Sequence, residues 1–148
     1  MIRHKNHGFQ FLELIRLEEC EIDQYQPVAG SYAVIKCQGK FLFCYNTWRK
    51  QWELPAGKRE GRESPKACAM RELYEETGQM VTEMDFIGLM VKHISNGTLK
   101  YNPVYGAMVE KLIPFVENEE TSGIMLWDTE ERVEVIDAVD LCLVKEIK

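Results

Sequence analysis

The helix predicted over residues 64–77 constrains the fold of this chain more than any other feature. Ser64 can cap its first free N–H groups, Pro65 fits its first turn, and Gly78 can adopt the left-handed conformation that ends a helix. A packing stripe along the helix consists of residues spaced three and four apart: Met70, Leu73 and Thr77. Such a helix needs a neighbouring layer to cover one face, so a layered fold is expected.

The same helix carries three carboxylates close together. Glu72 and Glu76 are four residues apart and Glu75 lies three from Glu72, so all three are expected on one face. Like charges at this spacing destabilise a helix by roughly 0.2–0.5 kcal/mol per pair, whereas Mg²⁺ or Mn²⁺ requires clustered hard oxygen ligands. Arg71 can pair with one carboxylate and fix its rotamer. A solvated acidic helix face is the alternative interpretation.

The spacing around these carboxylates resembles the Nudix box, G-x5-E-x7-R-E-U-x-E-E-x-G-U, in which U is apolar. All seven fixed positions are occupied, by Gly57, Glu63, Arg71, Glu72, Glu75, Glu76 and Gly78. Leu73 fills the first U, but Gln79 stands at the last, where Met80 or Val81 is expected to take over the packing. A chance match is on the order of one in a million, so the box outweighs the solvated-face interpretation.

Similarity to the Nudix hydrolases (MutT-like) implies a fold, a cofactor and a set of site residues. The implied fold is α/β, the Nudix-type α/β/α sandwich with a mixed β-sheet between helices, as a single domain over residues 1–148. The implied metal is Mg²⁺ or Mn²⁺, and its ligands would be Glu72, Glu75, Glu76 and the Ala56 carbonyl. Arg71 and Glu63 would support catalysis. The proton of the attacking water would pass to Glu72 or to an acid outside the box.

Candidates outside the box depend on weaker patterns. Glu120 lies in a polar loop before a strand, where related enzymes often place a further catalytic acid; a solvated loop is the alternative. We expect Arg49 and Lys58 to bind substrate phosphates and Trp48 to stack on a base. Ordinary surface charge competes with the first two assignments. Trp127 is expected to pack in the core.

The rest of the chain alternates strands and helices, which by itself indicates an α/β sandwich. Gln38-Gly39 separates two short apolar runs and predicts a hairpin, and Ala56-Gly57 predicts a turn. A closing helix is expected from residue 134 or 137 to 147. Strands are expected over residues 9–17, 32–37, 40–45, 85–92, 101–110 and 124–127.

Charge and composition restrict the partners. The net charge of −6, from 24 acidic and 18 basic residues, argues against duplex nucleic acid; bound metal would reconcile an acidic chain with a nucleotide-type small molecule. No apolar stretch approaches the roughly 20 residues that span a bilayer, and residues 1–10 lack an apolar signal-peptide core. We therefore expect a cytoplasmic protein without a membrane partner, as a monomer or homodimer. Five irregularly spaced cysteines predict reduced, mostly buried thiols, with Cys142 in packing.

Three functions are compatible with the box. Hydrolysis of a pyrophosphate bond in a nucleoside triphosphate is the first, because the chain is short. Hydrolysis of ADP-ribose or a nucleotide sugar is the second, because Ala56 between Pro55 and Gly57 is frequent in such enzymes. The third is a non-catalytic Nudix module that binds a nucleotide or metabolite. An intact carboxylate set argues against it, since a sensor has no need of one.

Overall fold

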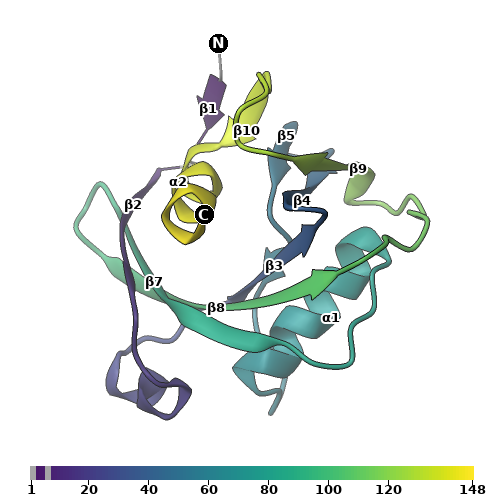
Figure 1. Cartoon of the computed structure of the whole chain (residues 1–148). Helices are drawn as coiled ribbons and strands as arrows, with labels where there is room; N and C mark the ends of the chain where they lie inside the picture. Colours follow the sequence, from purple (N-terminus) through teal and green to yellow (C-terminus); the bar gives the residue numbers. More distant parts are fainter. Residues whose placement is uncertain (1–2, 6–7) are drawn as a thin grey trace.

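The computed structural model describes residues 3–5 and 8–148, so part of the amino-terminal segment lies outside the described residues. A strongly curved sheet with a helix on either side makes up the described chain (Figure 1). In chain order the elements are β1 Arg3–Lys5, β2 Phe9–Ile15, the 3-10 helix η1 Glu19–Gln24, β3 Ser31–Cys37, β4 Lys40–Asn46, β5 Gln51–Glu53, β6 Ala56–Gly57, α1 Pro65–Thr77, β7 Asp85–Ile94, β8 Leu99–Val109, β9 Thr121–Trp127, β10 Val135–Asp137 and α2 Ala138–Ile147.

The sheet is mixed, as expected. Its strand order is β1-β10-β5-β4-β3-β8-β7-β2, with β6 paired to β3 and β9 paired to β4. β3 runs parallel to β8 and antiparallel to β4 and β6. The central strand β3 therefore connects the hairpin β7–β8 to the short strand β6 that precedes α1.

Alternation along β3 divides the interior into two cores. Tyr32 and Val34 belong to the cluster that also contains the buried residues of α2, whereas Ala33 and Ile35 belong to the cluster that contains those of α1. Successive side chains of a strand point to opposite faces, so one apolar run supplies both layers. The expected α/β/α sandwich is thereby confirmed.

Local sequence signals account for the ends of α1 and for the first hairpin. The Ser64 hydroxyl accepts a hydrogen bond from the Ala67 backbone N–H at 3.1 Å, and Gly78 adopts φ +79° at the carboxyl end. Gln38 and Gly39 both have positive φ, which is the requirement of a tight two-residue hairpin. These expectations are confirmed.

Several expectations about element boundaries are wrong. Ala56-Gly57 is a two-residue strand paired with β3, not a turn. The closing helix begins at Ala138 with Asp137 as its cap, because the Asp137 carboxylate accepts from Asp140 N at 3.0 Å. The preceding residues form β10, which pairs with β1 and β5, so the earlier start at residue 134 is excluded. The sequence also did not reveal β1, β5, β10 or η1.

Three side-chain expectations have mixed outcomes. Trp127 is buried, as expected. Gln79 is itself buried, although a neighbouring residue was expected to pack in its place. Its side chain donates to the Ile113 carbonyl at 2.6 Å and accepts from Ile113 N at 2.7 Å. Met80 is exposed, and Val81 alone takes a share of the packing. Cys142 is exposed, contrary to expectation, because it lies on the outer side of α2.

Most of the cysteine side chains are buried. Three of the five cysteines are buried and all five are free: buried Cys37, Cys44 and Cys68, and exposed Cys20 and Cys142.

Within residues 3–5 and 8–148, no helix has the length and apolar character needed to cross a bilayer.

Candidate active site

The glycine of the box is explained by close contact. A Cβ at Gly57 would lie 1.8 Å from the Glu72 Oε2 atom, so the carboxylate of α1 rests directly on the β6 backbone. Behind it, a Cβ at Gly30 would lie 2.2 Å from the Gly57 carbonyl oxygen. Both glycines are therefore required for the approach of helix, β6 and β3.

Glu76 is buried, a property that its position in the acidic cluster of the sequence did not reveal. Only 3% of it is exposed. Its Oε2 accepts a hydrogen bond from Ala56 N at 3.0 Å, and its Oε1 lies 3.8 Å from the Cys44 Sγ. Glu75, one residue earlier, is half-exposed. The three carboxylates thus differ in burial, because Glu72 and Glu76 face β6 and the sheet whereas Glu75 lies on a side of α1 that the sheet does not cover.

Arg71 gathers the acidic residues of the box around one guanidinium. Nε and Nη2 donate to the two Glu63 oxygens at 2.6 and 3.0 Å, and Nη1 donates to Glu72 at 2.9 Å and Glu75 at 3.2 Å. Nη2 also donates to the Lys58 carbonyl at 2.8 Å. Arg71 therefore ties the loop before α1 to the carboxylates on it, by planar paired contacts that an ammonium group does not make.

Glu120 reaches the same carboxylates from the loop before β9. Asn46 Nδ2 donates to its Oε2 at 3.0 Å, while Asn46 Oδ1 accepts from the backbone of residues 48 and 49. Burial is the main cause of the raised pKa of both Glu72 and Glu76, and the charge of Glu120 adds to the rise of each. Glu119 is exposed on the same loop. Of these two neighbouring acids, Glu120 is the one whose charge acts on Glu72 and Glu76.

The electrostatics of this cluster suit a cation. Burial raises the pKa of the Glu72 carboxyl to about 7, and the charges of Glu75 and Glu120 add to the rise while Arg71 opposes it. Burial, then Glu120 and Glu72, raise the pKa of Glu76 well above its ordinary value. Burying several like charges is costly unless a counter-charge accompanies them. A divalent cation would supply that counter-charge.

The donor chemistry therefore fits Mg²⁺ or Mn²⁺, which prefer carboxylate and carbonyl oxygens. In the part of the chain that the structure describes, no three His, Cys, Asp or Glu side chains already enclose a position for an ion. Glu72 is engaged by Arg71, and Glu76 by Ala56 N. Binding of metal would thus require these carboxylates to turn from their present partners.

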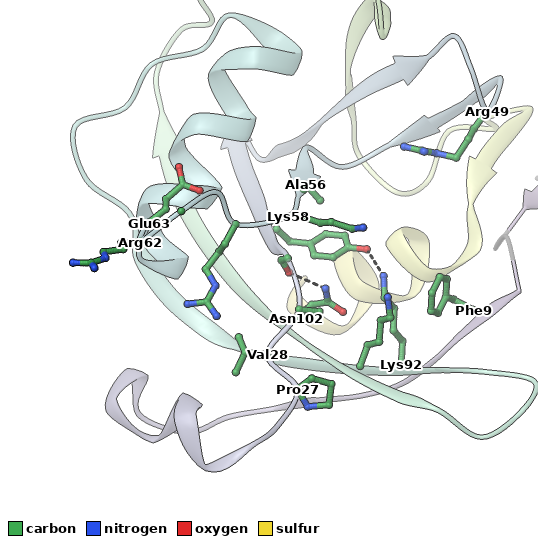
Figure 2. Close-up of a pocket in the computed structure, with 17 residues that line it drawn as sticks. Phe9, Pro27, Val28, Arg49, Ala56, Lys58, Arg62, Glu63, Lys92 and Asn102 are labelled. Atoms are coloured by element: carbon green, nitrogen blue, oxygen red, sulfur yellow. Dashed lines mark hydrogen bonds between the residues drawn. The ribbon is translucent and has the colours of Figure 1, made fainter.

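A large pocket opens beside Ala56 and Gly57. Its volume is about 850 Å³, and Glu63 is the acidic residue of its lining (Figure 2). Its cationic side chains come from four separate segments of the chain: Arg49, Lys58, Arg59, Arg62, Lys92 and Lys100. Such a concentration of positive charge suits a polyanionic ligand, although the whole chain is acidic.

Strand residues of this pocket were missed by the sequence reasoning. Lys92 Nζ donates to the Tyr32 hydroxyl at 3.0 Å and lies 4.6 Å from the centre of the Phe9 ring (Figure 2). Asn102 is buried on the neighbouring strand. Lys92 and Asn102 are polar residues in otherwise apolar strands, and this was the signal that the sequence offered. The sequence does not reveal the register between β7 and β8 that brings the two residues together.

The substrate-binding candidates separate into two groups. Arg49 and Lys58 both line the pocket. Arg49 is held by the buried Glu53, with Nε and Nη2 at 2.6 and 2.9 Å from its oxygens. Trp48 is 66% exposed and does not belong to the described residues that line the pocket. Its expected stacking role has no support from this arrangement.

The family of the chain follows from comparison with known proteins. A family model described as the NUDIX domain matches residues 24–147. The chain therefore belongs to the Nudix family, and the similarity inferred from the box is confirmed. Among individual relatives, YtkD of Bacillus subtilis (strain 168), provisionally named as an 8-oxo-dGTP diphosphatase, is 30% identical over 106 residues. That match covers 69% of this chain and 66%, just under two thirds, of YtkD.

Solved Nudix structures share the fold. The pyrophosphohydrolase BsRppH from Bacillus subtilis superposes with a TM-score of 0.68 at 20% identity, covering 94% of this chain and 87% of its own. A MutT NUDIX hydrolase from Burkholderia pseudomallei gives 0.68 at 22% identity, with 84% and 100% covered. The NUDIX domain of Shewanella oneidensis NrtR, solved with ADP ribose, gives 0.67 at 16%, with 88% and 97% covered. At these identities the likeness establishes the fold alone.

Proposed function

We propose that this protein is a metal-dependent pyrophosphohydrolase whose substrate is a nucleoside triphosphate. One observation carries the proposal: the carboxylates of Glu72 and Glu76 meet the backbone of Ala56-Gly57, with the charge of Glu120 acting on both, beside a pocket lined by six cationic side chains. Carboxylates can hold the metal and the cations can hold a polyphosphate. The names of YtkD and BsRppH, a diphosphatase and a pyrophosphohydrolase, support the reaction class.

Each residue of the site has a task in this reaction. Glu72, Glu75, Glu76 and the Ala56 carbonyl would hold Mg²⁺ or Mn²⁺, which when bound neutralises the phosphate oxygens and acidifies water. Arg71 orients Glu72 and anchors Glu63. Arg49 and Lys58 contact phosphate from the pocket.

The proton of the attacking water passes to Glu120 or Glu72. Asn46 and Arg49 both approach the Oε2 atom of Glu120, at 3.0 and 3.8 Å. Among the described residues, no hydrogen-bond donor approaches its Oε1, which therefore is the oxygen suited to take a proton.

A substrate panel tests the proposal. The protein is incubated with Mg²⁺ and nucleoside triphosphates, ADP-ribose or nucleotide sugars, and released phosphate, pyrophosphate and monophosphate are measured. We expect monophosphate from triphosphates and a strict requirement for divalent metal. ADP-ribose is the second candidate substrate, supported by the NrtR complex and by Ala56. Hydrolysis of ADP-ribose alone would show that it, and not a nucleoside triphosphate, is the substrate. Full activity in metal-free EDTA buffer would overturn the role of the carboxylates, and metal-independent nucleotide binding without turnover would indicate a sensor.

A further inference from the structure

Asn46 is a buried amide that contacts two parts of the proposed site. It lies at the carboxyl end of β4 and is fully buried. Its Nδ2 donates to Glu120 Oε2 at 3.0 Å, and its Oδ1 accepts from the backbone N–H groups of Trp48 and Arg49 at 3.0 and 2.8 Å. One side chain therefore joins the loop that carries Glu120 to the turn that carries Arg49, a residue that lines the cationic pocket (Figure 2).

These contacts leave the Asn46 amide only one orientation. Its oxygen can accept the two backbone N–H groups and its nitrogen cannot, so Oδ1 must face the turn. The nitrogen then faces Glu120, whose ionised carboxylate can only accept. Asn46 consequently presents a fixed donor to one oxygen of Glu120, and Arg49 Nη2 lies 3.8 Å from that same oxygen.

The backbone on either side of Glu120 is held by separate contacts. Thr47 donates to the Glu120 carbonyl through N at 2.8 Å and through Oγ1 at 3.0 Å, and Glu120 N donates to Asn118 Oδ1 at 2.9 Å. The next residue, Thr121, donates through its hydroxyl to the Glu76 carbonyl at 2.7 Å. The loop before β9 is thus anchored to the end of β4 and to the end of α1. What remains to be set is the direction of the Glu120 side chain.

We infer that Asn46 is a positioning residue for the proposed reaction. It holds Oε2 of Glu120, so that Oε1, to which no described residue donates, takes the proton of the attacking water. A glutamate side chain has several rotamers, and a carboxylate without such a contact would sample more than one direction. Because the same amide holds the backbone of Arg49, the acid and the phosphate contact keep one spacing. This inference rests on the proposed function and deepens it by naming the residue that orients the acid.

A purely structural role in the turn is the alternative, and Asn46→Asp separates the two roles. Asp makes the same turn contact as Asn, but it replaces the donor to Glu120 with a second oxygen. With Mg²⁺ and a nucleoside triphosphate, kcat should fall at least about tenfold, because a misplaced reacting group is costly, while KM changes by less than about threefold. An unchanged kcat, or a loss confined to KM, would overturn the inference.

A double-mutant cycle shows whether Asn46 acts through Glu120. Asn46→Asp should lower kcat by less than about threefold once Glu120→Gln has already removed the carboxylate that takes the proton. An equal loss with and without Glu120→Gln would overturn the inference and leave the proposed function intact. Full activity of Glu120→Gln alone would also overturn it, and the proton would then pass to Glu72. Absence of hydrolysis by the wild type would count against the proposed function itself.

Thermal unfolding in EDTA measures the contact without turnover. Asn46→Asp should lower the melting temperature at pH 8 by at least about 4 °C, since two carboxylates then face each other. Adding Glu120→Gln, whose amide nitrogen can donate to the new carboxylate, should recover at least about half of this loss. Strictly additive changes would show that the two side chains do not interact, and would overturn the inference.

Asn96→Ala is the matched control. Asn96 is exposed in the turn between β7 and β8, and its Oδ1 accepts from Thr98 N at 2.9 Å, just as Asn46 accepts from its own turn. The control should keep kcat and KM within about twofold of the wild-type values. A loss as large as that of Asn46→Asp would show that any weakened turn lowers activity, and would overturn the inference. If Asn46→Asp does not fold, Asn46→Ala with and without Glu120→Gln gives the same comparison of kcat.

Discussion

At the scale of single residues, Glu76 differs from an ordinary helix carboxylate because the sheet buries it. Its charge is opposed by Glu72 and Glu120, and its own contacts are one backbone N–H and one thiol. Burial of a charge is tolerated where function needs it and is unfavourable for stability alone. Glu76 is therefore the residue where activity and stability should respond in opposite directions.

We expect Glu76→Gln to lose turnover on the order of a hundredfold or more while its metal-free melting temperature at pH 8 stays equal or rises. The amide keeps an acceptor for Ala56 N but removes the buried charge and a metal ligand. Kinetics with Mg²⁺ and thermal unfolding in EDTA are measured in parallel. A variant that unfolds under conditions where the wild type is folded would show that the cluster is structural.

Arg71 makes a second prediction at this scale. Arg71→Lys should lose at least about tenfold in kcat, because an ammonium group lacks the planar fork that holds Glu63 and Glu72. The melting temperature should fall by less than about 4 °C, since a partly exposed ion pair contributes little. An unchanged kcat would exclude Arg71 from positioning the carboxylates.

At the scale of elements, the contact between α1 and β6 depends on backbone approach at two glycines. Gly57 faces the end of a flexible side chain, Glu72, whereas Gly30 faces the backbone carbonyl of Gly57. A side-chain end can move aside, but a backbone carbonyl held in a sheet cannot. Substitution at these two positions should therefore have different consequences.

Gly57→Ala should reduce kcat by at least about tenfold with a small loss of stability, because Glu72 must leave its place over β6. Gly30→Ala is the comparison, and it should lower the melting temperature substantially because two backbones must separate. Activity and thermal unfolding of both variants decide the matter. An unchanged kcat in Gly57→Ala would show that catalysis does not depend on the position of Glu72 over β6.

At the scale of the whole molecule, the site combines a cluster of acidic side chains with a pocket lined by cationic ones. The acidic cluster belongs to α1 and the loop before β9, while the cationic pocket lies among β6, β7 and β8. The electrostatic state of the acidic cluster consequently contributes to the stability of the fold, and this contribution depends on pH and on divalent cations.

Without metal, stability should fall as pH rises from about 4.5 toward 8. The folded state keeps the protons of Glu72, with a pKa of about 7, and of Glu76 to a higher pH than the unfolded chain does. A raised carboxyl pKa contributes stability that is present at low pH and lost as pH rises through the folded pKa. Buried Asp140 acts in the same direction.

Thermal unfolding at a series of pH values checks this prediction. In EDTA the melting temperature should be lower at pH 8 than at pH 5.5 by at least about 2 °C, Mg²⁺ should restore part of the difference, and Glu76→Gln should flatten the profile. A melting temperature that rises across this range in EDTA, or that ignores Mg²⁺ at pH 8, would contradict the electrostatic account.

Much of the fold was predictable because its signals are local. The caps of α1 and the Gln38-Gly39 hairpin depend on the identity of adjacent residues. Strands β1, β5 and β10 were not predictable, because three-residue strands form only when distant partners supply their hydrogen bonds. The first residue of α2 was not predictable for the same reason, because the pairing of β10 with β1 and β5 decides where the strand ends and the helix begins.

The sequence by itself determined the identity of the carboxylates and their spacing, because one helical turn places Glu72, Glu75 and Glu76 together whatever surrounds them. Only the tertiary structure decided which of them is buried, that Glu120 joins them through Asn46, and that Trp48 stays outside the pocket. Burial, register and convergence arise between elements far apart in the chain. No local pattern records them, because their energies depend on the packing of the whole sheet against both helices.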